Sequence, residues 1–298
     1  MKSIVTGGAG FIGSNLVDKL VKLGHDVVVI DNLLRGERKD VNKKAIFING
    51  DIRSKYLEKF FENTDYVFHL AAYPSVQLSI VEPREFNDVN VSGLVNILKF
   101  SVDCNVKRFI FSSSIAIYGN QSSDSLTEDL KHDPVCPYSL QKYIGEEYCK
   151  LFSKLYSIET VCLRYCNVYG NRMKSMGTYS FVLPIFLNQY RKGQPMTIRG
   201  DGTQQRDFVN VFDVVKANIL ASTSDKVGCG ESINIGTGIG TSINQIAEYI
   251  GGKSIYIDPV IEPKIIIGNN SKAKNLLNWK PTIQFKKWIQ ENKNKFKL

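Results

Sequence analysis

The chain has 298 residues and a formal net charge of +9, and it is long enough to bury a sizeable core in one large domain or two modest ones. Its 43% hydrophobic and 22% charged residues exclude a disordered chain, and no apolar run approaches the length of about 18 residues that a membrane-spanning helix needs. Because no basic run is interleaved with aromatic residues, the positive charge predicts a lysine-rich surface, or one that attracts an anionic substrate, rather than a nucleic-acid groove.

The six cysteines and three histidines show no metal-ligand spacing. No two cysteines form a C-x-x-C motif, so we expect no metal site. Met1 and Lys2 lead directly into an apolar run, so we also expect no signal peptide. The cysteines are then expected to be reduced core residues of a cytoplasmic protein, at positions 104, 136, 149, 162, 166 and 229.

A glycine-rich turn near the start of the chain is the strongest local signal. Residues 6–13 read TGGAGFIG, between an apolar run at 3–5 that predicts a strand and an amphipathic pattern at 14–23 that predicts a helix. The glycines fit both G-x-G-x-x-G and G-x-x-G-x-x-G, which let a pyrophosphate approach the backbone and the start of the helix. The same glycines also suit an ordinary turn from strand to helix, so the motif alone leaves both interpretations open.

The second expected strand ends in an acidic residue at the spacing that a dinucleotide requires. Val27–Ile30 is an unbroken apolar run, as in a buried parallel strand, and Asp31 follows it eighteen residues after Gly13. A carboxylate at about this spacing accepts hydrogen bonds from the adenosine ribose hydroxyls, and its charge repels a 2′-phosphate. We therefore expect NAD, and not NADP, to bind at this turn.

Strands and helices then alternate with short connections up to residue 166. Apolar runs predict strands at 45–48, 66–72, 106–111 and 160–164, and amphipathic patterns predict helices at 87–103 and 138–156. This alternation indicates an α/β fold, a Rossmann-type doubly wound parallel sheet in which ligands bind at the carboxyl ends of the strands. The residues expected at those ends are Gly7, Asp31, Asp51, Ala72, Ser114 and Asn167.

Two polar residues in these strands have competing interpretations. Asp51 follows the strand at 45–48, and it is placed either to hydrogen-bond the adenine amino group or to cap a helix at 54–61. His69 lies inside the strand at 66–72, and we expect it to be a packed core residue rather than a catalytic group.

From Asn167 onward the regular alternation stops. Helices are expected at 181–192, 213–221, 242–250 and 285–296, with Asp213 as the cap of the second and a turn at 200–202. We expect residues 1–166 to form an NAD-binding domain to which the chain returns at about 206–236. Residues 167–298 are expected to form a smaller α/β lobe that binds the substrate.

Tyr138 and Lys142 are the sharpest catalytic signal. Residues at i and i+4 lie on the same face of a helix. A tyrosine with its ordinary pKa of about 10 is a poor base, but a nearby ammonium together with the positive nicotinamide ring favours the phenolate, which can act as a general base near neutral pH. Y-x-x-x-K alone is common, but downstream of a nucleotide motif and of Ser114 it predicts a catalytic set.

Together these motifs resemble the extended short-chain dehydrogenase/reductase family, and within it the NAD-dependent nucleotide-sugar epimerase/dehydratase group. The resemblance covers nearly the whole chain. Besides the segments above, it rests on DNL at 31–33, GDI at 50–52, HLAA at 69–72, SSS at 112–114 with YG at 118–119, RYCNVYG at 164–170 and, as the most specific later segment, GDGTQQRDF at 200–208.

The resemblance implies roles for individual residues. In this family the residue matching Ser114 hydrogen-bonds the sugar oxygen that is oxidised, the one matching Tyr138 exchanges its proton, and the one matching Lys142 holds the nicotinamide ribose. Asn167 and Arg206 match residues that contact the diphosphate of a nucleotide sugar, a task for which the forked arginine side chain is suited. The implied NAD-binding residues are Gly7, Gly10, Phe11, Ile12, Gly13, Asp31, Asn32, Asp51, Ile52, Leu70, Ala71, Ala72, Asn90, Tyr138, Lys142 and Tyr165.

The residues after Ser114 favour one reaction of this group. Dehydratases carry Asp-Glu there, and decarboxylases usually carry a glutamate, whereas Ile115 and Ala116 cannot transfer protons. The resemblance therefore implies 4-epimerisation of a UDP-hexose through a transient 4-keto sugar, as in the UDP-glucose 4-epimerases, interconverting UDP-galactose and UDP-glucose. The alternatives are a UDP-N-acetylhexosamine or UDP-glucuronate epimerase, a decarboxylase or a reductase on the same scaffold, or a non-catalytic NAD-binding protein.

Two positions depart from the family pattern. The phosphate-binding arginine of the R-x-G-E segment is replaced by Pro259, and Lys264 or Arg172 could supply the missing charge. The pocket-wall position that controls entry of N-acetylated sugars matches Ile266, which favours plain hexoses. The resemblance also implies a homodimer in which helices matching about 91–103 and 139–156 pair across a two-fold axis.

Overall fold

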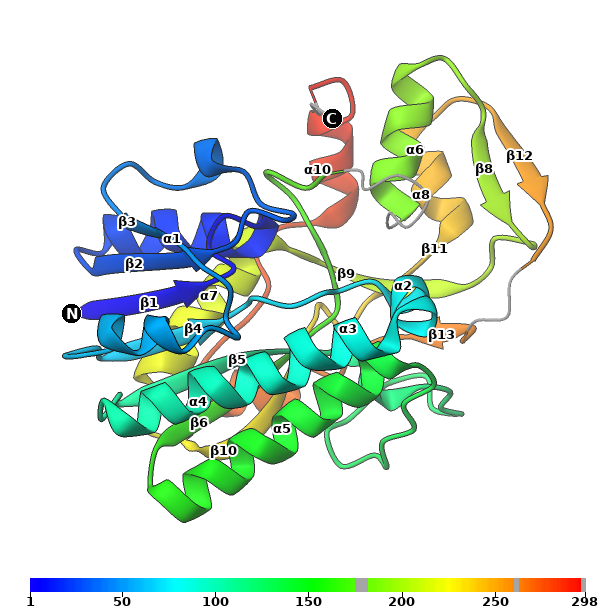
Figure 1. Cartoon of the computed structure of the whole chain (residues 1–298). Helices are drawn as coiled ribbons and strands as arrows, with labels where there is room; N and C mark the ends of the chain where they lie inside the picture. Colours follow the sequence, from blue (N-terminus) through cyan, green and yellow to red (C-terminus); the bar gives the residue numbers. More distant parts are fainter. Residues whose placement is uncertain (175–181, 260–262, 296–298) are drawn as a thin grey trace.

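A seven-stranded parallel sheet forms the centre of the molecule (Figure 1). The computed structural model describes residues 1–174, 182–259 and 263–295. The strands of the central sheet, in chain order, are β1 (Lys2–Thr6), β2 (Asp26–Asp31), β3 (Ile46–Asn49), β4 (Tyr66–His69), β5 (Arg108–Ser114), β6 (Glu159–Tyr165) and β10 (Cys229–Ile235).

The order of these strands is β10-β6-β5-β4-β1-β2-β3, and every neighbouring pair is parallel. The winding of the chain reverses between β1 and β4, and in a doubly wound sheet this switch point is where ligands bind. The predicted fold class is therefore confirmed. β10 joins the edge of the sheet within the segment that was expected to return there, while the division into residues 1–166 and 167–298 stays a prediction.

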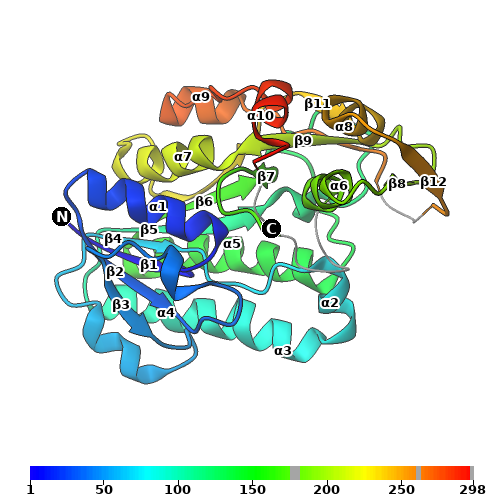
Figure 2. The ribbon, with the colours of Figure 1, turned by 90° about the horizontal axis from the view of Figure 1, so that it is seen from above.

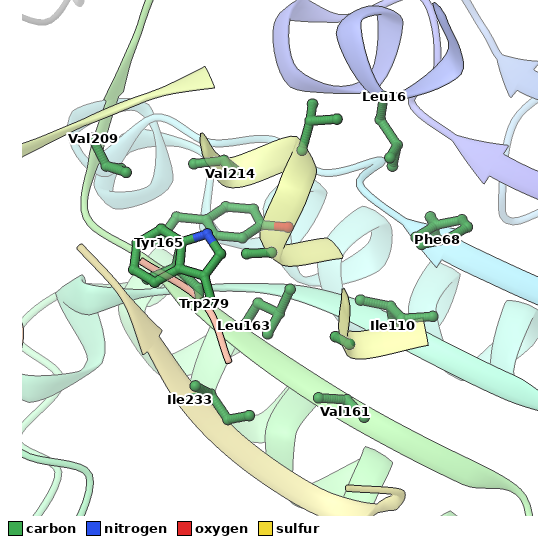
Figure 3. Close-up of a cluster of buried hydrophobic side chains, with 14 of the residues drawn as sticks. Leu16, Phe68, Ile110, Val161, Leu163, Tyr165, Val209, Val214, Ile233 and Trp279 are labelled. Atoms are coloured by element: carbon green, nitrogen blue, oxygen red, sulfur yellow. The ribbon is translucent and has the colours of Figure 1, made fainter. Parts of the chain in front are cut away.

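Helices cover both faces of the sheet (Figure 2). One face carries α1 (Phe11–Lys22), α7 (Val211–Thr223) and α9 (Ser271–Leu277), and the other carries α4 (Gly93–Asp103) and α5 (Pro137–Tyr156). On the first face, Leu16 of α1 and Val214 of α7 belong to a large apolar cluster that also holds Tyr165 and Trp279 (Figure 3). Two-sided burial explains the unbroken apolar runs of the strands.

Asp213 was expected to cap the helix α7, but it has another role in the structure. The cap of α7 is Asn210, whose side chain accepts a hydrogen bond from the Phe212 N–H, so the prediction of Asp213 as the cap is wrong. The Asp213 carboxylate is buried in the first turn instead, and it accepts hydrogen bonds from the backbone N–H of Thr282 and of Ile283. It therefore fixes the segment after α9 to the face of the sheet.

The helix expected at 87–103 is part of a longer and less regular helical segment. It begins with α3 (Pro83–Asn87), passes through one π-helical turn (Asp88–Ser92) and continues as α4. A further short helix, α2 (Val76–Val81), precedes it. π-turns are rare and often found at functional sites, and this one carries Asn90.

A smaller lobe lies beyond the carboxyl ends of the central strands (Figures 1 and 2). Its strands are β7 (Asn167–Tyr169), β9 (Gln205–Asn210), β11 (Gly240–Ser242) and β13 (Ile265–Ile266) in one sheet, and β8 (Met196–Arg199) and β12 (Ser254–Ile257) in another. Its helices are α6 (Val182–Arg191), α8 (Ile243–Ile250) and α10 (Phe285–Asn292). The core of the lobe includes stacked rings of Phe208 and Phe285 with centroids 4.4 Å apart.

The expected ranges of α6 and α8 agree with the structure, whereas α10 ends at Asn292, earlier than the expected 296, because the chain leaves the helix in a turn at 293–295. Phe181 and Phe296, at which two helices were expected to begin and to end, lie outside the described residues. In the described ranges, no helix is both long and apolar enough to cross a membrane. All six cysteines are free, but Cys104 is only half-buried and Cys229 is exposed, so the expectation of six core cysteines is wrong for these two.

Candidate active site

The glycine turn joins β1 to α1 with almost no space between backbone segments. A methyl group on Gly7, whose φ is +70°, would lie 2.7 Å from the Ala71 nitrogen, and one on Gly13 would lie 2.1 Å from the Gly7 carbonyl oxygen. Gly10 stands at the N-cap of α1 without a side-chain cap, so the first N–H groups of the helix, from Phe11, Ile12 and Gly13, have no partner within the helix. These donors are available to an anionic group.

The ends of β2 and β4 close around this turn. The Asp31 carboxylate accepts hydrogen bonds from the Ala9 N–H at 3.0 Å and from the Leu33 N–H at 2.8 Å. On the other side, the Leu70 N–H donates to the Thr6 carbonyl and the Ala71 N–H donates to the Thr6 hydroxyl. Asp31 thus fixes the glycine turn, and it keeps lone pairs for the ribose hydroxyls that it was predicted to bind.

Asp51 is held by its neighbour Arg53 and caps no helix. The following 3₁₀ helix (Lys55–Phe60) has Ser54 before it and no side-chain cap, so the capping alternative is wrong. Arg53 binds both carboxylate oxygens of Asp51, at 2.8 and 2.9 Å, and this lowers the pKa of Asp51 to about 2. Asn32 also donates to Asp51, at 3.2 Å, which joins these two predicted cofactor residues at the ends of β2 and β3.

Three other predicted cofactor residues direct their side chains into the protein. Asn90 makes two hydrogen bonds with the Tyr73 backbone and a third, at 2.9 Å, with Gln141 on α5. The Tyr165 hydroxyl donates to Asn218 at 2.9 Å inside the apolar cluster of Figure 3, and Ile52 is buried beneath α4. A cofactor contact at Tyr165 or Ile52 is therefore left to the backbone. Ala72, another of the predicted cofactor residues, is half-buried just after β4.

Ser114, Tyr138 and Lys142 come together at the end of β5. The Ser114 side chain lies close enough to Tyr138 to act on its phenol, where it lowers the pKa. The Lys142 ammonium lies one helical turn further along α5, 5.9 Å from the centroid of the Tyr138 ring, and donates to the Ser112 carbonyl at 2.7 Å. The structure therefore brings these three predicted residues to one strand end, and their catalytic roles stay a prediction.

The pKa of Tyr138 is not lowered by the chain itself. Burial raises this pKa to about 12, and only the neighbouring Ser114 side chain acts in the other direction. Burial also lowers the pKa of Lys142 to about 8. Lys142 alone therefore does not make Tyr138 a base, and the expected phenolate depends on the second positive charge of the prediction, that of the nicotinamide ring.

His69 is the packed core residue that the sequence indicated. Its ring stacks on Phe109 and Phe111, and its Nδ1 shares a hydrogen bond with the Thr6 hydroxyl at 2.9 Å. Burial lowers the pKa of this imidazole to about 3, so it is neutral at physiological pH.

The predicted substrate residues gather on β7, β9 and β13. Asn167 donates to the Asp207 carbonyl at 3.3 Å, and Ile266 is the register partner of Arg206. Ile266 packs against the large apolar cluster, and a methyl group on the buried Gly268 would meet the side chains of Cys166 and Ile115, which follow β6 and β5. This part of the second lobe therefore adjoins the catalytic strand end.

Two cations were expected to replace the arginine missing at 259, and the structure distinguishes them. Arg172 forms an ion pair with Asp18 of α1 at 2.8 Å, and Lys174 in the same loop forms ion pairs with Glu37 at 2.5 Å and with Asp40 at 3.3 Å. Arg172 is thus tied to the glycine-turn helix through Asp18, while its Nη1 is buried without a hydrogen-bond partner. Lys264 directly precedes β13 and is exposed, which places it nearer to Arg206; residues 260–262 of that segment lie outside the described residues.

The chain was also compared with known proteins. Residues 3–236 match the NAD dependent epimerase/dehydratase family. The chain belongs to this family. It is an isomerase similar to UDP-glucose 4-epimerases, and NAD is its cofactor.

Three similar proteins show the range of the family's substrates. A putative UDP-glucose 4-epimerase of Methanocaldococcus jannaschii is 41% identical over 96% of this chain and 95% of its own. The crystal structure of a UDP-glucose 4-epimerase with UDP-glucose from Thermotoga maritima has a TM-score of 0.93 and 38% identity, covering 98% of this chain and 97% of that one. A UDP-N-acetylglucosamine 4-epimerase of Methanobrevibacter ruminantium, solved with UDP-N-acetylmuramic acid, has a TM-score of 0.93 and 35% identity, covering 98% and 96%.

The residues of this epimerase fit NAD at the glycine turn. The uncapped start of α1 suits the pyrophosphate, and in the described part of the chain a methyl group on Gly10 would meet the Gly7 carbonyl oxygen at 3.2 Å and otherwise point into open space. Asp31 stands where the adenosine ribose is expected. Among the described residues, no three acidic, histidine or cysteine side chains gather in a way that could hold a metal ion.

Sequence reasoning missed several residues that support the epimerase site. Ser79 of α2 is fully buried and accepts a hydrogen bond from the Tyr138 N–H at 3.2 Å. Asp207 is buried beside Arg206 and accepts hydrogen bonds from Thr237, Gly238 and Gly268, which join three segments of the second lobe. These partners are distant in sequence, so no local pattern points to them.

Proposed function

We propose that the enzyme catalyses the 4-epimerisation of a UDP-hexose, interconverting UDP-galactose and UDP-glucose. The observation that carries the proposal is that Ser114 acts on the Tyr138 phenol at the carboxyl edge of a dinucleotide-binding sheet, with Lys142 one helical turn behind Tyr138. Two hydroxyls close together at this edge can both bind one sugar oxygen. This arrangement suits the removal and return of a proton at that oxygen.

Each of the three residues has a distinct task. Tyr138 accepts the proton of the sugar 4-hydroxyl and later returns it, while Ser114 hydrogen-bonds the same oxygen. Lys142 contributes a positive charge that favours the phenolate and holds the nicotinamide ribose. NAD held at the glycine turn and by Lys142 would supply the hydride acceptor and donor, so the reaction would have no net redox change.

The residues after Ser114 support epimerisation over elimination or decarboxylation. Ile115 is buried in the apolar cluster, and Ala116 has no side-chain group that could carry a proton. Neither of the two residues after Ser114 can therefore act as an acid or a base. Chemistry that needs a second acid or base lacks a group here.

The substrate side of the site supports a nucleotide-diphosphate sugar. Asn167 and Arg206 lie on paired strands, and Lys264 is near enough to add a positive charge in place of the arginine missing at 259. In the proposed assignment, Ile266 lies opposite Arg206 in the wall of the substrate pocket. Its side chain, which is of intermediate size, narrows this pocket. A plain hexose fits this wall better than an N-acetylated one.

A second candidate is the epimerisation of a UDP-N-acetylhexosamine, which the 35% identity to the Methanobrevibacter ruminantium enzyme supports. A UDP-glucuronate epimerase is a third member of the same class. Incubation of the purified NAD-loaded enzyme with UDP-galactose, UDP-N-acetylgalactosamine and UDP-glucuronate, followed by NMR of the products, separates the three. We expect the enzyme to convert UDP-galactose alone. An enzyme that converts neither UDP-galactose nor UDP-N-acetylgalactosamine would contradict the proposal.

Variants at Ile266 test the wall directly. Ile266→Ala should admit UDP-N-acetylgalactosamine, whereas Ile266→Tyr should leave turnover of UDP-galactose and exclude the larger sugar. Ile265→Val, at the adjacent position of the same two-residue strand, is the matched control and should change neither ratio. If Ile266→Ala and the unmodified chain show the same preference between the sugars, the assignment of this wall is wrong.

We also propose that the enzyme is a homodimer that pairs through α4 and α5. Leu140, Leu151 and Leu155 of α5 are 45%, 46% and 60% exposed, and their spacing places them along one side of a long helix. A second copy of the same helix pair would cover them. Sedimentation should give a dimer, and Leu151→Glu should give a monomer, whereas Leu23→Glu, at an exposed position after α1, should not. A monomeric unmodified chain would contradict this proposal.

We infer that the enzyme works in the cytoplasm, because six unpaired cysteines suit a reducing compartment. Fractionation of cells with an antibody to the chain tests the location, and recovery outside the cytoplasm would contradict it.

A further inference from the structure

A buried ion pair lies beneath the catalytic strand end. Arg164 of β6 and Glu146 of α5 are 2% and 3% exposed, and their closest nitrogen–oxygen distance is 2.6 Å. The Arg164 guanidinium also donates to the Tyr118 hydroxyl at 2.6 Å and contacts the His132 Nε2 at 2.8 Å. Burying two charges costs several kcal/mol per ion, so such a pair is weak evidence of stability alone. A role in positioning the site residues explains why the chain buries this ion pair despite its cost.

Glu146 reaches the strand that carries Ser114. Its carboxylate accepts a hydrogen bond from the Ser113 hydroxyl at 2.5 Å, and another from Ser232 of β10 at 2.8 Å. On the neighbouring residue, the Ser112 carbonyl accepts the hydrogen bond from Lys142. The two residues before Ser114 are thus both held from α5, which fixes where the Ser114 hydroxyl points.

Glu146 also places a negative charge one helical turn after Lys142. Burial lowers the pKa of Lys142, and the Glu146 carboxylate and Cys149 act in the opposite direction. His69 on β4 faces the same ammonium, which lowers the pKa of that buried imidazole. Among these groups Glu146 is the carboxylate, so it is the group that can hold Lys142 in its charged form at neutral pH.

We propose that Glu146, itself held by Arg164, is a positioning residue of the epimerase: it fixes Ser114 through Ser113 and places a compensating charge behind Lys142. The inference rests on the roles proposed above for Ser114 and Lys142. It adds a buried group that touches neither cofactor nor substrate and acts through two residues that do.

The test is the pH dependence of kcat for Glu146→Gln in the full-length NAD-loaded enzyme. The amide keeps the shape of the side chain and one accepting oxygen but removes the charge. Lys142 should then lose its proton at a lower pH, so the alkaline limb of the profile should move to lower pH by about one unit. At pH 8, close to the pKa of about 8 that Lys142 has in this chain, kcat should then fall about fivefold.

A matched control lies at the opposite end of the same strand pair. Glu159 of β6 forms an ion pair with Arg108 of β5, whose side chain is 8% exposed. Glu159→Gln should leave both kcat and the alkaline limb unchanged, because this pair contacts no site residue. A Glu146→Gln enzyme with the alkaline limb of the unmodified chain, measured per folded molecule, overturns the proposal.

Ser113→Ala separates the two parts of the proposal and serves if Glu146→Gln does not fold. It removes the hydrogen bond to the strand but leaves the charge, so kcat should fall while the alkaline limb stays in place. Unchanged kcat overturns the positioning of Ser114. Tyr138→Phe distinguishes a failure of the proposed function from a failure of this inference. If Tyr138→Phe stays active, the proposed function fails. If Tyr138→Phe is inactive while Glu146→Gln behaves as the unmodified chain, only this inference fails.

Discussion

Replacing Gly13 by alanine tests whether the glycine turn holds NAD by close backbone contact. The new methyl group would lie 2.1 Å from the Gly7 carbonyl oxygen and 2.9 Å from the Gly8 Cα. Because non-bonded carbon atoms pack about 3.5 Å apart or more, the turn must move by about 1 Å. Overpacking of this kind costs about 1–3 kcal/mol of stability, and a displaced pyrophosphate site should weaken NAD binding at least about tenfold.

Two further glycines separate binding from folding. Gly10→Ala brings its methyl group no closer than 3.2 Å to the Gly7 oxygen, so the fold should persist while the methyl group occupies the space of the pyrophosphate. Gly24→Ala is the control: it lies just after the same helix, with a φ of +82° and no heavy atom within 4 Å. It should lose about 1–2 kcal/mol of stability through backbone strain alone and bind NAD normally.

The assay pairs calorimetric titration with NAD and urea unfolding of each variant. We expect Gly13→Ala to lose both affinity and stability, Gly10→Ala to lose affinity, and Gly24→Ala to lose stability. A Gly13→Ala enzyme that binds NAD as tightly as the unmodified chain would refute the geometry argued for the turn.

Acid should destabilise the fold through His69. Its imidazole stays neutral in the folded state, with a pKa of about 3, but gains a proton on unfolding below its ordinary value of 6.5, so stability is lost as pH falls, by about 2 kcal/mol between pH 6.5 and 5. Urea unfolding at both pH values should show a smaller loss for His69→Gln, and an equal loss in both proteins would count against this assignment. Arg172→Met breaks the ion pair that ties the loop after β7 to α1, so bound NAD should exchange faster against labelled NAD, while Lys287→Met at an exposed helix position should not change the rate. An unchanged exchange rate for Arg172→Met would mean that the ion pair does not limit cofactor release.

The first half of the fold was predictable because its elements are long and follow one another along the chain. Apolar runs bounded by the glycine turn and by Asp31 gave β1, α1 and β2 close to their observed limits. Strands β8, β12 and β13 have only two to four residues, and their pairing depends on partners far along the chain, so no local pattern marks them. The cap of α7 was misplaced because Asn210 and Asp213 are both good caps by residue type.

The reacting groups of the candidate site were predictable from the sequence, but the buried residues that support them were not. Tyr138 and Lys142 share a helix, so their spacing alone brings them to Ser114 once the sheet order is known. No local pattern in the sequence indicates that Glu146 and Arg164 are buried. Only the packing of α5 against β5 and β6 shows that both are buried and that they meet beneath Ser113.

The most direct test of the account is the turnover of UDP-galactose by Tyr138→Phe, followed by NMR of the product. Ser139→Thr, at the next position of α5, is the matched control because its hydroxyl serves only the start of the helix. The account predicts that the unmodified chain and Ser139→Thr form UDP-glucose, and that Tyr138→Phe loses about 10²–10⁴-fold in kcat with unchanged NAD content and unfolding midpoint. Turnover by Tyr138→Phe at the rate of the unmodified enzyme would contradict the central claim that this phenol exchanges the substrate proton.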